Sequence, residues 1–96
     1  MDKNDLIDEL KKTGRLTAEH VARWRDASDL LAVFDVIGRD GANALVKVDG
    51  GRSNGSVYTV VVSGGSLGES FFRRDGDDLI ELLSDAIAFY KTSAYW

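Results

Sequence analysis

The spacing of apolar residues changes from a helical period to a strand period near the middle of the chain. Val21, Trp24, Leu31 and Phe34 recur at intervals of three and seven residues, so a helix would bring them onto one face. After residue 43, apolar residues alternate with polar ones or form β-branched runs, as they do in strands. The two patterns occupy separate blocks, which predicts an α+β fold with Trp24 in its core.

Two or three helices are predicted for the N-terminal block. The first covers about residues 3–13 and carries Leu6, Ile7 and Leu10 on its apolar stripe. Thr17 is a preferred N-cap residue and predicts the start of a second helix. Ser28 is also a preferred N-cap residue, so the apolar face that follows Thr17 belongs either to one long helix or to two shorter ones.

Three strands and a final helix are predicted for the C-terminal block. The strands cover residues 44–49, 57–63 and 67–74, and the glycine-rich turns between them favour an antiparallel meander. Apolar residues on both faces of the middle strand are typical of a central position. Asp75 is predicted to cap the final helix, whose wide apolar stripe over residues 79–90 packs on the sheet.

The length and composition of the chain predict a single cytoplasmic domain. With 96 residues, of which 44% are hydrophobic, the chain can bury one core, so we expect one α+β domain over residues 1–96. The absence of cysteine excludes disulfides and thiolate metal sites, and it favours a reducing compartment. The N-terminal residues do not form a signal peptide, and the longest strongly apolar run, Val60–Val62, is far shorter than the roughly 20 residues of a membrane span.

The residue types needed for catalysis, metal binding and phosphate binding are missing or misplaced. His20 is the only histidine, and no nucleophile motif accompanies it. The acidic segment 75–78 begins like a calcium loop, but the twelfth position of that loop is Ala86 in place of glutamate. The glycines of segment 64–68 precede a predicted strand, whereas phosphate-binding loops precede a helix. We therefore predict no enzyme activity, no metal and no cofactor.

A helix-turn-helix DNA-binding regulator is the alternative that the helical block raises. Segment 6–37 would supply its helices, and the following hairpin, with Arg52 at its tip, would resemble a wing. Residues 1–48, however, contain nine acidic and eight basic side chains, so this half offers no net positive field to a phosphate backbone. The charge balance argues against binding to nucleic acid.

Acidic charge is concentrated near the end of the chain. The net charge is −4, and segment 75–90 contains five acidic residues and no basic one. Such a surface would attract a basic protein and speed its association. Two arginines precede this segment and two aromatic residues end the chain, a composition typical of protein-binding hot spots. The predicted partner-binding residues are Asp75, Asp77, Asp78, Glu81, Asp85, Arg73, Arg74, Tyr95 and Trp96.

Three segments carry a resemblance to a known class of proteins: the strand Val57–Val62, the segment Phe71–Asp75 and the helix Asp78–Tyr90. In size, acidity and arrangement, the region from about 45 to 92 resembles the small immunity proteins of bacterial polymorphic-toxin and contact-dependent inhibition systems. The resemblance implies a tight, stoichiometric inhibitor of a toxin domain, often a basic nuclease, that meets the acidic stretch 75–85. The sequence is also compatible with a phage-encoded inhibitor similar to anti-CRISPR proteins, with a homodimer paired through an exposed sheet edge, and with the DNA-binding regulator.

Overall fold

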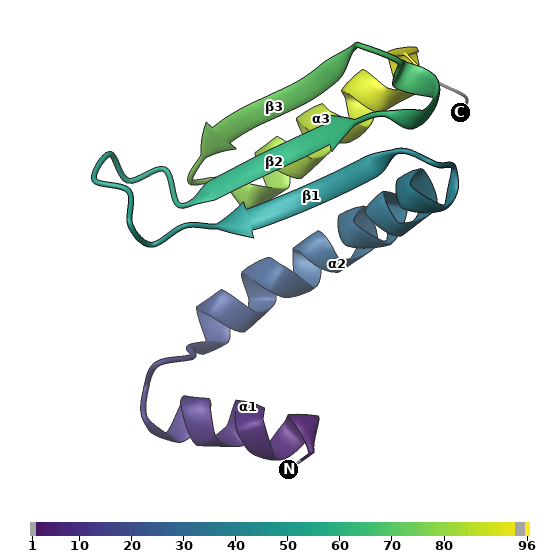
Figure 1. The fold of residues 1–96 in the computed structure, drawn as a ribbon. Coiled ribbons are helices and arrows are strands. Elements are labelled where there is room, and N and C mark those ends of the chain that lie inside the picture. The colour runs from purple at the N-terminus through teal and green to yellow at the C-terminus, as the bar shows by residue number, and fades with distance from the viewer. Residues whose placement is uncertain (1, 94–95) are drawn as a thin grey trace.

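Two helices lead into a three-stranded sheet, and a third helix follows it (Figure 1). The computed structural model describes residues 2–93 and Trp96. Within that part of the chain the elements are, in order, α1 (Lys3–Lys12), α2 (Ala18–Arg39), β1 (Asn43–Val48), β2 (Tyr58–Ser63), the short 3-10 helix η1 (Gly65–Leu67), β3 (Phe71–Gly76) and α3 (Leu79–Ser93). The strand order β1-β2-β3, antiparallel at both pairings, confirms the predicted α+β class and meander.

β2 lies at the centre of the sheet, as its apolar composition predicts. Val60, for example, pairs with Val46 of β1 on one side and with Arg74 of β3 on the other. Side chains alternate between the two faces along a strand, so Tyr58, Val60 and Val62 share one face, and all three are buried. Their packing on that face is the setting in which β-branched and aromatic residues stabilise a strand.

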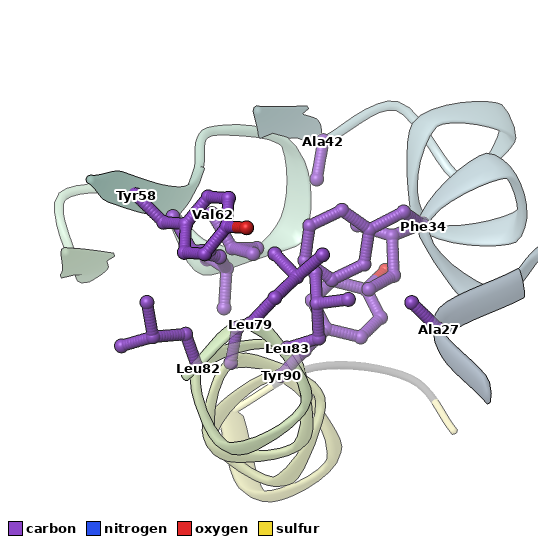
Figure 2. Close-up of a cluster of buried hydrophobic side chains, with 13 residues drawn as sticks. Ala27, Phe34, Ala42, Tyr58, Val62, Leu79, Leu82, Leu83 and Tyr90 are labelled. Carbon is purple, nitrogen blue, oxygen red and sulfur yellow. The ribbon is translucent and has the colours of Figure 1, made fainter. Parts of the chain in front are cut away.

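α3 and the C-terminal half of α2 cover this buried face of the sheet (Figure 1). α3 packs against β2, β3 and α2, while α2 also packs against β1. Figure 2 shows side chains from both helices and from the sheet gathered in one cluster. The helices and the sheet therefore share a single core. Its buried members are Ala27, Phe34, Ile37, Ala42, Tyr58, Val60, Val62, Leu67, Leu79, Leu82, Leu83, Ala86 and Tyr90.

α2 is one continuous helix of 22 residues, which decides between the two predicted arrangements. Ser28 does not cap a new helix, because its hydroxyl donates to the carbonyl oxygen of Arg25 at 2.7 Å. Ala27, next to it, is fully buried in the core. Trp24, one turn earlier, is only partly buried and lies edge-on to Tyr58, with the ring centroids 6.2 Å apart. The predicted core position of Trp24 is therefore correct only in part, because its ring packs against the core cluster but keeps part of its surface exposed.

The connection between β2 and β3 is longer than predicted. The chain forms η1 after β2, and β3 begins at Phe71 rather than at residue 67. Leu67, predicted to be in the strand, is buried in the core from η1. Gly65 has a φ of +58°, and a Cβ atom there would approach the backbone nitrogen of Ala42 to 2.8 Å. Only glycine fits this close approach, so Gly65 allows the tight turn that delays the start of β3.

The N-terminal helices form an arm that projects from the rest of the molecule (Figure 1). We define the arm as residues 2–25, which contain α1 and the first part of α2. No residue of α1 is buried, and the molecule has a long axis of 46 Å. Although α2 is the longest described helix, neither it nor any other described helix is apolar over a length that would cross a membrane. Of the arm residues, Trp24 alone packs against the core that the sheet shares with α2 and α3.

Tyr90 joins α3 to the end of α2 through a hydrogen bond. The residue is 1% exposed, and its hydroxyl donates to Oδ2 of Asp40 at 3.0 Å. Burial, and next the neighbouring Asp40 carboxylate, raise the pKa of Tyr90 above its usual value of about 10. The folded protein holds this proton more tightly than the unfolded chain does. The resulting stability is complete below about pH 10 and is lost as the pH rises further.

We expect Tyr90→Phe to lower the free energy of unfolding by about 1 kcal/mol near neutral pH, the usual net value of one hydrogen bond. Above about pH 10 the difference between the two proteins should shrink, because only the wild type loses the tyrosine contribution. Urea unfolding of both proteins near neutral pH and at about pH 11 measures this difference. A difference that does not change with pH would show that Tyr90 titrates alike in the folded and unfolded states.

Candidate protein-binding surface

The carboxylate that caps α3 is that of Asp78. Its Oδ1 atom accepts a hydrogen bond from the backbone N–H of Glu81 at 3.1 Å, the usual N-cap pattern. The predicted cap, Asp75, is wrong, because β3 continues through Asp75 to Gly76, which still pairs with Tyr58 of β2. Strand pairing therefore extends past Asp75 and delays the start of the helix.

Four carboxylates lie at the start and along the exposed side of α3, and we call Asp77, Asp78, Glu81 and Asp85 the acidic ridge. Glu81 and Asp85 are one helical turn apart, and their side chains are 54% and 43% exposed. The other side of α3 contributes five buried residues to the core, more than either α1 or α2. A helix anchored in this way holds the acidic ridge in a fixed orientation.

One arginine lies within the acidic ridge, and it comes from the neighbouring strand. Arg74 of β3 contacts Asp85 through Nη1 and Glu81 Oε1 through Nη2, the second at 3.0 Å. Four negative charges and one positive charge leave three net negative charges on this surface. Arg23 of α2 lines a shallow depression together with Asp77 and Asp78. The ion pair that Arg23 makes, at 3.6 Å, is with Glu19. The surface is therefore less acidic than segment 75–90 taken alone, and the sign of its net charge is unchanged.

Asp75 lies on the opposite face of the sheet and belongs to a different cluster. Thr59 donates a hydrogen bond from Oγ1 to Asp75 Oδ1 at 2.6 Å, and Arg52 Nη1 lies 3.3 Å from the same oxygen. The hydrogen bond from Thr59, more than the charge of Arg52, lowers the pKa of Asp75. Arg52 also contacts Thr59 and, at 3.5 Å, Asp49. These contacts attach the β1–β2 loop to the sheet, so the prediction that Asp75 shares a surface with the ridge is wrong.

The contacts of Arg52 also bear on the DNA-binding alternative. Arg52 is the only cation in the β1–β2 loop, residues 49–57, which would be the wing. Its Nη1 atom donates to the carbonyl oxygens of Ser56 at 3.2 Å and Tyr58 at 3.5 Å, and its side chain is 20% exposed. A guanidinium held by these groups cannot reach a phosphate backbone without giving them up. This arrangement weakens the DNA-binding alternative.

The remaining predicted interface residues lie away from the acidic ridge. Arg73 is on the sheet face that the described helices leave uncovered, one residue out of phase with Arg74. Trp96 is 69% exposed, and Nζ of Lys91 lies 5.9 Å from its ring centroid. Tyr95 is outside the described residues. The structure thus brings together five of the nine predicted residues, namely the acidic ridge and Arg74.

An exposed apolar patch on the uncovered face of the sheet was not among the predicted sites. Leu45 of β1 pairs with Val61 of β2, and Phe71 of β3 lies diagonal to Val61. Leu45 and Phe71 are 54% and 63% exposed. The sequence feature that could have predicted this patch is a run of apolar residues at consecutive strand positions. Neighbouring side chains of a strand point to opposite faces, so every second apolar residue of such a run points away from the helices.

The arrangement of possible metal ligands and the comparisons with known proteins do not indicate a site other than the protein-binding surface. Within residues 2–93 and 96, no three histidine or acidic side chains converge as ligands for a metal ion. His20 is exposed in the first turn of α2. No family model, curated protein or solved structure matches the chain. A functional conclusion therefore depends on the geometry of the acidic ridge and its surroundings.

Proposed function

We propose that this chain acts by binding another protein, and that the acidic ridge with Arg74 is the surface it presents. The observation that carries the proposal is the position of the ridge at the start and along the exposed side of α3, the helix that contributes most buried side chains to the core. Groups on a rigid element recognise a partner with less loss of conformational entropy than groups on loops. A basic partner would find three net negative charges already in place.

The partner we propose is a basic toxin domain, such as a nuclease, in the cytoplasm of a bacterial cell. Enzymes that act on nucleic acid bind its phosphates with lysine and arginine side chains. A fixed array of carboxylates complements such a site, and the attraction speeds association. The chain would then neutralise the toxin by stoichiometric binding, as immunity proteins do. A phage-encoded inhibitor would use the same chemistry, and a neighbouring toxin gene separates the two roles.

Affinity capture from a lysate of the cells that carry the gene tests this proposal. We expect the immobilised protein to retain one basic protein in a one-to-one ratio, and nuclease treatment of the lysate should not release it. Expression of that protein alone should be toxic, and co-expression of this chain should relieve the toxicity. Retention of nucleic acid without protein, or of a captured protein whose toxicity this chain does not relieve, would contradict the proposal.

A further inference from the structure

Two leucines of α1, Leu6 and Leu10, form an apolar stripe that is uncovered in the described part of the chain. Leu6 and Leu10, one turn apart, are 49% and 39% exposed, and no residue of α1 is buried. Asp2 caps the helix through a hydrogen bond from the backbone N–H of Asn4 at 2.6 Å. Even with a cap, a helix of ten residues is marginal in water unless its apolar face is packed. The stability of α1 therefore calls for a surface that covers Leu6 and Leu10.

The arm also contains an apolar groove that Leu6 and Leu10 do not line. The groove lies between α1 and α2 and has a volume of about 620 Å³. Leu6 and Leu10 border a separate depression, together with Glu9 and Arg15. One chain thus presents an apolar stripe and an apolar groove, and the stripe does not fill the groove. The groove is lined by Ile7, Leu16, His20, Val21, Trp24 and Arg25.

Charged residues border both the stripe and the groove. Glu9 and Arg15 lie beside Leu6 and Leu10, whereas Arg25 is part of the groove lining. Within residues 2–93 and 96, neither Glu9 nor Arg25 makes an ion pair. A stripe placed in the groove of another copy, with Glu9 toward Arg25, would bring an unpaired carboxylate to an unpaired guanidinium, and this ion pair would fix one orientation of the two copies.

We propose that two copies of this chain pair through their arms. Each copy places Leu6 and Leu10 in the groove of the other, with Glu9 of each copy beside Arg25 of the other. A contact with two-fold symmetry makes every interaction twice, which suits a surface that carries both complementary parts. The acidic ridge lies at the start of α3 and along it, outside residues 2–25, so this pairing does not depend on the proposed function.

The arm is large enough for a stable interface. Such interfaces bury about 800 Å² on each partner, which is about an eighth of the 6543 Å² surface of this chain. The arm, residues 2–25, is a quarter of the chain, and all its residues are exposed or only partly buried. Formation of the dimer would cover the stripe and the groove together.

Sedimentation equilibrium of the full chain over about 5 to 200 µM tests the proposal. We expect a mass of about 21 kDa, twice the 10.5 kDa of one chain. The variant Leu6→Ala/Leu10→Ala should sediment as a monomer, with an unchanged melting temperature for the core. The matched control Leu45→Ala/Phe71→Ala removes two exposed apolar side chains from the sheet and should remain a dimer.

A charge swap tests the orientation of the two copies. We expect Glu9→Arg and Arg25→Glu each to raise the dimer dissociation constant about tenfold or more. In the double variant the dissociation constant should return most of the way to the wild-type value. A wild-type monomer at the highest concentration would overturn the proposal. So would a dimer that persists in Leu6→Ala/Leu10→Ala, or a double variant no better than the single ones. Each of these results would leave the proposal that the acidic ridge binds a partner unchanged, because the ridge residues lie outside the arm.

Discussion

Replacing Leu83 with alanine should lower the free energy of unfolding by about 3–5 kcal/mol. Leu83 is 0% exposed and lies in the cluster shared by α2, α3 and the sheet (Figure 2). Its close-packed neighbours cannot relax fully into the space that the truncated side chain leaves. Domains of this size are stable by only about 5–15 kcal/mol, so the unfolded fraction should rise about 100-fold or more.

Leu45→Ala is the matched control for the Leu83 variant. It removes the same atoms from a side chain that is 54% exposed on the uncovered face of the sheet. Its cost should be about 0.5 kcal/mol, the usual size of a surface effect. Urea unfolding followed by circular dichroism measures both variants. Equal midpoints for the two would show that α3 does not pack on the sheet through Leu83.

The fold could be predicted from the sequence wherever a local pattern determines it. The β-branched run over residues 57–63 becomes the central strand, and the apolar stripe over residues 79–90 becomes α3. The pattern misleads at Asp75, which has the residue type of an N-cap but lies in β3. The pairing of Gly76 with Tyr58 keeps Asp75 in the strand. Because this contact joins residues far apart in the sequence, the local pattern around Asp75 cannot predict it.

The acidic ridge could be predicted as a set of residues but not as a surface. A count of charges over segment 75–90 finds no base, whereas Arg74, which precedes that segment, reaches the ridge from β3. Strand alternation predicts that Arg73 and Arg74 point to opposite faces. Which of them meets α3 depends on the register that pairs Arg74 with Val60, on the face that the helices cover. The pairing of the strands in the folded protein therefore determines which arginine meets α3, and the amino-acid composition does not.

Removal of three charges from the acidic ridge should weaken partner binding about 100-fold or more. The variant Asp77→Asn/Glu81→Gln/Asp85→Asn preserves the size and polarity of each side chain and leaves the Asp78 cap in place. Arg74 is 47% exposed, so water can solvate it after its two carboxylate partners are lost. The loss of such exposed ion pairs costs about 1 kcal/mol or less, so the variant should stay folded.

The matched control is Asp26→Asn/Asp29→Asn/Glu69→Gln, which removes the same three charges from exposed positions outside the acidic ridge. Calorimetric titration of both variants against the basic protein retained in the capture experiment compares the two surfaces directly. If the ridge is the binding surface, its variant loses about 100-fold in affinity, and the control loses less than about threefold. An equal loss in both variants, or no loss in the ridge variant, would contradict binding through the acidic ridge.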